Sequence, residues 1–265
     1  MTALATIEDR TAQVWAQISK VIDPELDESV VDLGFVHHVS VREGDEVHVG
    51  FRLPTYWCAA NFSFLMADDI RRAVSDLPWS KRVSVVLDEH MYADQINNGL
   101  SKGLSFEQTF GEEADGDLDE LRLVFLIKAF QRRQLALLDH MTLLGYSPDV
   151  LVKMTVSELK AAPLDDAGRR LVERYLDRLS AVRPAELASI AFVTEDGSEL
   201  TRDVLPKHVS RLKSVDLNAE FNSMICRGLL AGRYADATET PAHANQSACA
   251  GQCASKCAGR IASAS

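Results

Sequence analysis

The sequence lacks the features that would place the protein in a membrane or on nucleic acid. No apolar run approaches the ~20 residues of a membrane-spanning helix, and Glu8, Asp9 and Arg10 follow Ile7 where a secretion signal would become apolar. Basic residues are also fewer than acidic ones: the chain has 28 Lys and Arg and 39 Asp and Glu, which gives a formal net charge of -11. A surface of that sign repels phosphate backbones and anionic lipids. We therefore predict a cytoplasmic protein that binds neither nucleic acid nor membrane.

The sequence also lacks the short motifs of several enzyme classes. It contains no zinc-protease helix motif, no nucleophile elbow, no glycine-rich nucleotide fingerprint and no Walker-type loop, which disfavours a nucleotide-dependent enzyme. An apolar content of 46% and a charged content of 25% are those of an ordinary globular protein, so a core is expected. Small basic clusters at 131–134 and 168–170 lie on predicted helices and are expected to face solvent.

Cysteine is scarce and unevenly placed. The cysteines are Cys58, Cys226, Cys249, Cys253 and Cys257. An odd number without a secretion signal favours free thiols or metal ligands over a disulfide framework. Cys226 lies beside the apolar stripe of a predicted helix, and for it we expect a packing role.

Residues 1–107 alternate element types in an order that predicts a small α+β domain. Apolar residues recur at helical spacing or at every second position, which indicates the elements in turn. These are a helix over 14–22 that ends before Pro24, strands over 39–41 and 47–53 joined by a turn at 43–45, a helix over 59–77 and a strand over 83–87. This order, helix-strand-strand-helix-strand, predicts a sheet with helices packed on one face.

Beyond this domain the sequence predicts a linker, a helical domain and a tail. Residues 108–117 are acidic and contain glycine, with little to bury, which is typical of a linker. Residues 118–234 have helical periodicity almost throughout. Residues 235–265 form an Ala- and Ser-rich tail with three cysteines, and Ile261 is its one branched aliphatic residue. The expected fold is α+β, followed by an all-helical domain and a flexible tail.

Capping residues predict where several helices of the helical domain begin and end. Residues 118–144 predict one long helix capped by Gly145, and Ser147-Pro148 starts a short helix. Thr155 and Glu158 match the capping-box pattern of another helix start. A last helix is predicted from an apolar stripe, which consists of Leu217, Phe221, Met224, Ile225 and Leu229.

Cys58 is the residue best placed for chemistry in the N-terminal domain. It follows the predicted strand that ends at Leu53 and precedes the helix that begins near Ala59. Free backbone N–H groups and the positive end of a helix dipole favour the thiolate, which is the form that attacks electrophiles and binds metals. From position alone, the alternative is a simply buried cysteine.

Three sequence segments lie around this cysteine: Val21-Ile22-Asp23-Pro24-Glu25-Leu26, Val31-Asp32-Leu33-Gly34-Phe35-Val36 and, after a hairpin, Pro54-Thr55-Tyr56-Trp57-Cys58. In this order they resemble the metal-sulfur cluster assembly factor family, which includes PaaD-like and SufT-like proteins. The resemblance implies that Asp23, Glu25, Thr55 and Cys58 line the functional pocket, with Cys58 contacting a cluster or metal. In this two-domain form it suggests proteins that accompany bacterial di-iron monooxygenases. The alternatives are a turn residue at Asp23 and a strand-end hydroxyl at Thr55.

The three tail cysteines form a second candidate metal site. Cys249, Cys253 and Cys257 are equally spaced, and on a straight helix the outer two would lie ~12 Å apart along the axis. One metal cannot bind both, because Zn–S bonds are ~2.3 Å long. We therefore expect either that glycines let the tail wrap around a metal or cluster, or that one adjacent pair binds with help from a residue such as His243. An incidental mobile tail is the alternative.

These observations predict an accessory protein, not an enzyme, that helps assemble or deliver an iron-sulfur cluster or iron centre to a client metalloenzyme subunit. We expect the N-terminal domain to contact the metal and the helical domain to recognise the client, for which the resemblance suggests a di-iron monooxygenase component. The first alternative is a folding chaperone or scaffold that binds an apo-enzyme and handles no metal. The second is a thiol-dependent enzyme that uses Cys58, although no histidine lies close to it in sequence to act as its base.

Overall fold

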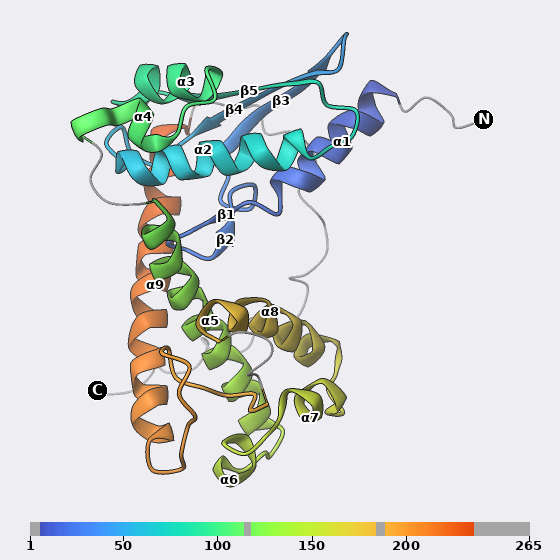
Figure 1. The fold of residues 1–265 in the computed structure, drawn as a ribbon, viewed down its shortest axis with the longest axis vertical. Coiled ribbons are helices and arrows are strands. Elements are labelled where there is room, and N and C mark those ends of the chain that lie inside the picture. Colours follow the sequence, from blue (N-terminus) through green and yellow to red (C-terminus); the bar gives the residue numbers. More distant parts are fainter. Residues whose placement is uncertain (1–5, 114–117, 184–188, 236–265) are drawn as a thin grey trace, which may run out of the picture.

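The computed structural model describes residues 6–113, 118–183 and 189–235. Figure 1 shows a sheet with its helices at the top of the molecule and a group of helices at the bottom. Two long helices, α5 (Leu118–Leu143) and α9 (Leu205–Arg233), run between the two parts. The predicted α+β part followed by helices is confirmed. No helix in the described ranges has the length and apolar character needed to cross a membrane.

The sheet of the N-terminal part has three strands in the order β3-β4-β5. β3 (Val36–Arg42) pairs antiparallel with β4 (Glu46–Arg52), and β5 (Arg82–Asp88) lies parallel to β4. The β3–β4 turn has positive φ at Gly44 (84°) and Asp45 (65°), a conformation that glycine adopts freely and aspartate tolerates. The predicted hairpin and third strand are therefore confirmed.

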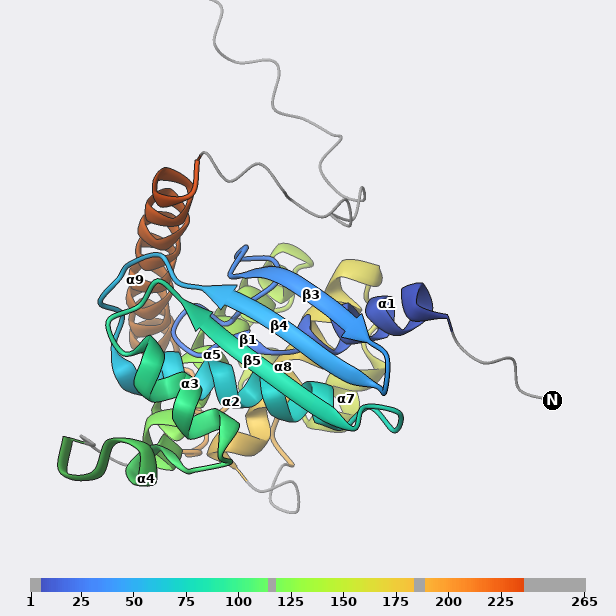
Figure 2. The same cartoon turned by 90° about the horizontal axis from the view of Figure 1, so that it is seen from above.

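Two helices cover one face of this sheet (Figure 2). α1 (Ile7–Ile18) contacts β3, α2 (Ala60–Ser75) contacts β5, and the two helices contact each other. Their apolar sides are buried with Val47, Val49 and Phe51 of β4 in one core. The apolar face that alternation gives β4 and the apolar face that helical spacing gives α2 thus pack against each other, as the sequence predicted.

Helix α1 ends earlier than the sequence predicted. It begins after a capping box between Thr6 and Asp9 and ends at Ile18. The chain then forms a small hairpin of β1 (Ile22–Asp23) and β2 (Glu28–Ser29). The prediction was wrong because the apolar residues after Ile18 happen to continue the helical spacing, although they are buried through the hairpin instead.

The N-terminal core extends into the predicted linker. Three short helical elements follow β5: α3 (Ala93–Ser101), α4 (Phe106–Phe110) and η1 (Gly111–Glu113). Phe110 is buried, and its ring centroid lies 4.8 Å from that of Phe106. The beginning of the 108–117 segment is therefore held by aromatic packing, while residues 114–117 lie outside the described residues. The division into domains at this point stays a prediction.

The helical part has its own core. Its helices are α5, α6 (Pro148–Leu151), α7 (Val156–Ala161), α8 (Asp166–Val182) and α9. The long helix and the capping box of α7 at Thr155 are confirmed. At the centre, Tyr175 is fully buried, and its hydroxyl donates to the carbonyl of Ala191 (2.6 Å) and accepts from Nε2 of Gln134 (3.1 Å). This pairing satisfies polar groups that burial would otherwise penalise.

The expectation of a solvent-facing basic cluster at 131–134 is wrong. Gln131, Arg133 and Gln134 are buried, because α5 packs against both α8 and α9. Arg133 instead forms a bidentate ion pair with Asp27 of the N-terminal part, with Nε–Oδ2 at 2.8 Å and Nη2–Oδ1 at 2.7 Å. The buried charges are tolerated because they are paired with two hydrogen bonds.

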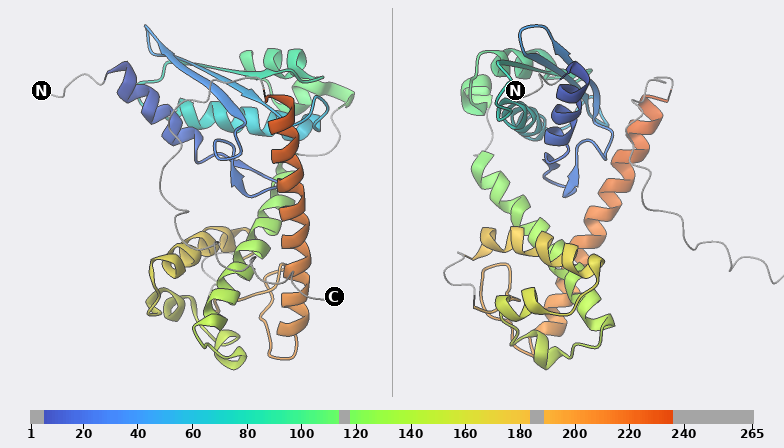
Figure 3. Two further views of the ribbon diagram at one scale, coloured as in Figure 1. Left: turned by 180° about the vertical axis from the view of Figure 1, so that it is seen from behind. Right: turned by 90° about the vertical axis from the view of Figure 1, so that its right-hand side faces the viewer.

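The predicted helix at this apolar stripe is confirmed as α9, which presents the stripe to solvent. Figure 3 shows it running from the helical part up to the sheet. The stripe residues all project into solvent: Leu217 (66% exposed), Phe221 (62%), Met224 (73%), Ile225 (43%) and Leu229 (46%). The inward face carries Ala219, Ser223 and Leu230, and Leu230 belongs to the N-terminal core. Helical spacing predicted the helix correctly but could not tell which face would be covered.

Candidate functional site

Cys58 lies between the end of β4 and the start of α2, at the edge of the N-terminal core. Its side chain is half-buried, and Sγ lies 3.1 Å from Oγ1 of Thr55. The N-cap residue of α2 is Ala59, which has no side chain able to cap the first turn. Cys58 therefore directly precedes the N-terminal end of α2, where the backbone N–H groups have no backbone partner within the helix. Two of the residues that the resemblance places in the functional pocket, Thr55 and Cys58, are thus in contact.

His90 holds the backbone of Cys58 in place. Its Nδ1 accepts a hydrogen bond from the backbone N–H of Tyr92 (3.2 Å), so Nε2 is assigned the proton and donates to the carbonyl oxygen of Cys58 (2.9 Å). Burial lowers the pKa of His90, and the bond to the Cys58 carbonyl only partly opposes this effect. A neutral histidine that contacts the carbonyl positions the thiol and does not serve as its base. Sequence analysis missed His90, because nothing nearby in the chain marks it.

Asp23 and Glu25 lie on the β1–β2 hairpin. The carboxylate of Asp23 is buried and accepts backbone hydrogen bonds from Glu25 (2.9 Å) and Leu26 (2.8 Å). Burial raises the pKa of Asp23 to about 6, in spite of these bonds. Glu25 is exposed, and its Oε1 accepts a hydrogen bond from Nδ2 of Asn222 on α9 (3.0 Å). The turn role considered for Asp23 is therefore confirmed, and its role in a functional pocket stays a prediction.

Cys226 of α9 is half-buried against the N-terminal core. Burial and, to a smaller extent, the charges of Asp23, Cys58 and Glu25 raise the pKa of its thiol to about 11. On the preceding turn of α9, Asn222 and Ser223 contact Glu25 and Glu28 of the β1–β2 hairpin, so the structure brings α9 to the hairpin that carries Asp23 and Glu25. Sequence analysis assigned Cys226 to packing, and its contact with the N-terminal core agrees with that in part. Cys226 lies far from the N-terminal part in the sequence, so its position gave no indication that α9 would pack against that part.

Few side chains in the described residues are placed to bind a metal ion together. Within residues 6–113, 118–183 and 189–235, no three His, Cys, Asp or Glu side chains converge in a way that would hold a metal ion. The predicted ligands Cys249, Cys253 and Cys257 lie outside the described residues. The metal-binding roles of Cys58 and of the tail therefore stay predictions.

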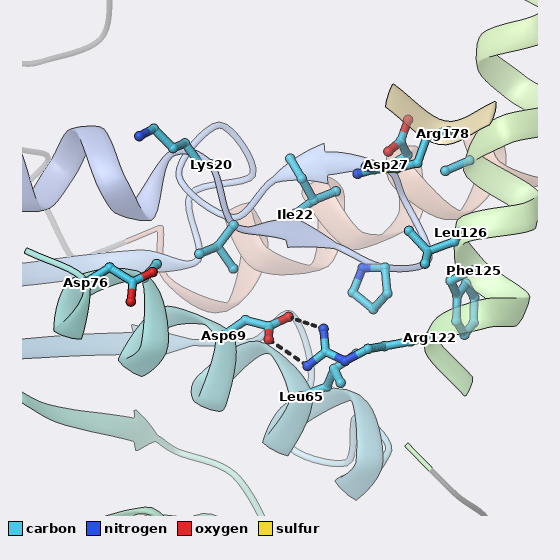
Figure 4. A pocket seen from close by; sticks show the side chains of 14 residues that line it. Lys20, Ile22, Asp27, Leu65, Asp69, Asp76, Arg122, Phe125, Leu126 and Arg178 are labelled. Atoms are coloured by element: carbon cyan, nitrogen blue, oxygen red, sulfur yellow. Dashed lines mark hydrogen bonds and ion pairs between the residues drawn. The ribbon is translucent and has the colours of Figure 1, made fainter. Parts of the chain in front are cut away.

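A cavity of about 360 Å³ lies elsewhere, between the β1–β2 hairpin, α2 and α5 (Figure 4). Lys20, Phe125 and Arg178 contribute to its lining. On one wall Arg122 forms a bidentate ion pair with Asp69, with Nη1–Oδ2 at 2.8 Å and Nη2–Oδ1 at 2.6 Å. Neither thiol of the site lines this cavity, so its chemistry is separate from that of Cys58.

Comparison with known proteins connects the N-terminal part to cluster assembly. Residues 11–86 match the family model described as iron-sulfur cluster assembly protein. The chain is 30% identical over 105 residues to "Fe-S cluster assembly factor HCF101, chloroplastic" of Oryza sativa subsp. japonica, which covers 38% of this chain and 20% of that protein. It is 30% identical over 96 residues to an iron-sulfur cluster carrier protein of Mycobacterium leprae, which covers 36% and 24%.

A shorter relative is matched over most of its length. The chain is 29% identical over 72 residues to the Fe-S protein maturation auxiliary factor YitW of Bacillus subtilis, which covers 27% of this chain and 69% of that protein. The first two relatives are much longer than the matched region, so the match spans only about a fifth to a quarter of each. No solved structure matches the chain significantly. Asp23, Glu25, Thr55 and Cys58 all lie within the residues that the family model matches.

Proposed function

We propose that this protein assembles or delivers an iron-sulfur cluster, or iron, to a client metalloenzyme, because residues 11–86 match the family model described as iron-sulfur cluster assembly protein and the relatives include a carrier and a maturation factor. The cluster is cargo, and the protein performs no catalytic turnover of its own. We assign this role to the cytoplasm. A di-iron monooxygenase component is the client that the two-domain resemblance suggests.

The position of Cys58 carries this proposal. It is a half-buried thiol at the start of α2, within the matched residues and 3.1 Å from the Thr55 hydroxyl. Cysteine thiolates are the usual ligands of iron-sulfur clusters. The hydroxyl can donate to an anionic sulfur, and His90 fixes the backbone that presents it. A rigidly presented thiol is suited to hold a cluster that other ligands complete.

Cargo must be released, so the full ligand set need not come from the described residues. Cys58 supplies one thiolate, whereas ferredoxin-type clusters use four. In this proposal the remaining positions are filled by the tail thiols Cys249, Cys253 and Cys257, by the client, or by both in turn. Partial ligation by the carrier makes exchange to a client with a complete ligand set favourable.

Cluster transfer tests the proposal directly. The full chain is reconstituted anaerobically with iron and sulfide and mixed with an apo-ferredoxin, whose cluster is followed by circular dichroism. We expect Cys58→Ser to abolish transfer without changing the melting temperature appreciably, since the change is nearly isosteric. Ser75→Ala, an exposed change on the same helix α2, is the matched control. Transfer by Cys58→Ser at the wild-type rate would refute the role of this thiol.

The exposed face of α9 favours a second function, the binding of a metal-free client subunit. Exposed apolar patches of this kind mark protein contacts. The face lies on the same stretch of α9 whose inward side carries Cys226, so a client bound there is separated from the site by one helix diameter, ~10 Å. A metal-independent chaperone would use this face alone.

Two variants separate the functions. If the protein is a cluster carrier, Cys58→Ser abolishes maturation of the co-expressed client while the variant still co-purifies with it. If it is only a chaperone, a chain with all five cysteines changed to Ser still matures the client, and Phe221→Lys on the exposed face prevents maturation. Leu229→Lys, at the end of the same face, tests how far the contact extends.

A further inference from the structure

The exposed face of α9 is left open by the rest of the described chain. Figure 1 and Figure 3 show the helix running along one margin of the molecule, so another molecule can reach this face. Its large apolar side chains are 43–73% exposed: Leu217, Phe221, Met224, Ile225 and Leu229.

This face carries no charge along its middle. An α-helix turns by about 100° per residue. From Ser214 to Gly232, every side chain within about 80° of the direction of Phe221 is uncharged. A solvated helix face normally carries charged residues, whereas the core of a protein interface is depleted of them. The exposed face therefore has the composition of an interface core.

The described chain itself gives no reason for two glycines on this face. Gly228 and Gly232 are exposed, neither has a positive φ, and a Cβ atom at either would meet no atom within 4 Å. Glycine is also a poorer helix former than any residue except proline. What glycine does provide is room for another backbone or side chain to approach closely. The two glycines therefore mark places where a second molecule can come nearest to α9.

We propose that the exposed face of α9 binds the same face of a second copy of this chain, in an antiparallel dimer whose two-fold axis passes between Met224 and Ile225. In such a dimer, positions at equal distances on opposite sides of the axis face each other. Each outer large side chain then lies opposite a glycine of the second copy. The facing pairs are Leu217 with Gly232, Phe221 with Gly228 and Met224 with Ile225.

The antiparallel direction follows from shape. A parallel pair would place Phe221 against Phe221 and Gly228 against Gly228, so it would crowd one layer and leave a gap in another. The core of a specific interface is packed as closely as a protein interior. A parallel pair would also bring both sheets to the same end, because α9 reaches the sheet at its C-terminal end (Figure 3).

The area of the face is sufficient for such a dimer. A large apolar side chain presents about 200 Å², so five that are on average about half exposed present roughly 500 Å² in each copy. Two copies together bury roughly 1,000 Å², the size at which specific interfaces begin. The tail, residues 235–265, has Ile261 as its one branched aliphatic residue and offers little apolar area for the same face. A second copy offers an equal area of matching shape.

One edge of the face adds opposite charges. Glu220 and Arg227 are exposed on the same side of α9. In the dimer, Glu220 of one copy lies beside Arg227 of the second copy, with ~3 Å between their positions along the helix axis. Arg227 also contacts Glu28 of its own chain, which holds its side chain near this edge. Charges arranged in this way favour the antiparallel register.

Sedimentation velocity of the full chain tests the dimer, with a reductant present and at physiological salt. We expect the mass to rise with concentration from 29.2 kDa toward twice that value. Phe221→Lys should weaken association about 10-fold or more, because it places a charge in the core of the interface. Leu143→Lys on α5, where the leucine is 86% exposed, is the matched control and should associate as wild type does. A wild type that stays monomeric, or Phe221→Lys associating equally well, would overturn the proposal.

A substitution at Gly228 separates the dimer from the fold. Gly228→Leu should leave the melting temperature of the dilute, monomeric chain equal to or above that of wild type, because leucine is the better helix former and the space around it is open. The same change should weaken association about 10-fold or more, since the new side chain occupies the place of Phe221 of the second copy. Association of Gly228→Leu at wild-type strength would show that the proposed seating is wrong.

Disulfide trapping tests the direction of the helices. In a chain whose five cysteines are changed to Ser, Leu217→Cys combined with Gly232→Cys should give a covalent dimer on mild oxidation, because these positions face each other. The single variants are the controls, since the two copies of position 217 lie ~22 Å apart along the axis and cannot be joined. Cross-linking by Leu217→Cys alone, or none by the double variant, would contradict the antiparallel dimer.

The dimer does not rest on the proposed function, and the outcomes distinguish the two. If wild type stays monomeric while Cys58→Ser abolishes cluster transfer, the dimer is refuted and the carrier role stands. If Phe221→Lys and Gly228→Leu both prevent association while Cys58→Ser transfers clusters at the wild-type rate, the dimer stands and the role of this thiol is refuted.

Discussion

The two cores of the protein differ in how far each depends on the rest of the chain. The core of the helical part is formed by residues between Phe130 and Leu212. The core of the N-terminal part is formed by residues between Val14 and Phe110, and then by Leu230, which α9 brings from near the other end of the described chain. A domain that looks independent in sequence is therefore completed by a helix from elsewhere.

Helix α9 belongs to both cores. Leu205 and Leu212 near its start are buried in the helical part, whereas Leu230 and the half-buried Cys226 contact the N-terminal part. A continuous helix is stiff along its length, so a displacement of one end of α9 also moves the other end. In the proposed function, a client that displaces the helical part would therefore also displace the residues of α9 that complete the N-terminal core.

The strongest test of this comparison removes a ring from the self-contained core. Phe192 is fully buried, and its ring centroid lies 5.7 Å from that of Tyr175. Phe192→Ala should lower the free energy of unfolding by about 3–5 kcal/mol, because it leaves a cavity. Hydrogen exchange should show lost protection in α5 and α8 before the sheet is affected. Equal loss of protection throughout the chain would mean that the cores are not separable.

The next test breaks the buried ion pair between the two parts. Asp27→Asn keeps a residue that tolerates the positive φ of 50° at this position but leaves Arg133 without its bidentate partner. We expect a loss of about 3 kcal/mol in urea denaturation, since the arginine stays buried. Asp216→Asn, which affects the more exposed pair with Arg132, is the control and should cost at most about 1 kcal/mol. Equal losses would show that burial is not what makes the first pair important.

A third test asks whether α9 completes the N-terminal core. Leu230→Ala should cost about 2–3 kcal/mol and reduce exchange protection in the sheet more than in the helical part. Its neighbour Leu229 is 46% exposed, so Leu229→Ala should change stability by less than about 0.5 kcal/mol. If the two alanine variants unfold alike, Leu230 does not belong to the core in solution.

The smallest expected effect is a pH dependence at the boundary between the parts. Burial raises the pKa of Asp23 from 3.8 to about 6 in the folded state. The folded protein then binds more protons than the unfolded chain between these values, so this group's contribution to stability is present below pH 4 and is lost as pH rises through 6. We expect wild type to lose about 2 kcal/mol relative to Asp23→Asn between pH 4 and pH 7. Parallel stability profiles of the two proteins in urea would contradict this.

Local sequence patterns were sufficient to predict the helices and strands, but they did not predict which residues surround α5 and α9. The turn after Arg42, the helix after Cys58 and the capping box at Thr155 were predictable because each depends on neighbours in sequence. The burial of Arg133 was not, because its partner Asp27 lies 106 positions away. His90 was missed for the same reason, since its bond to Cys58 spans 32 positions.

The sequence by itself determined the order of helices and strands, the sheet with helices on one face, and the first candidate thiol, because periodicity, turn chemistry and a family-like segment are written in neighbouring residues. Tertiary structure alone decided which face of α9 is covered and that Cys226 and Leu230 of this helix pack in the N-terminal core. The physical reason is that the hydrophobic effect favours burial of apolar area but does not specify which partner covers it, because it is not directional. Long-range contacts, among them those of Ser223 and Arg233, select the covered face.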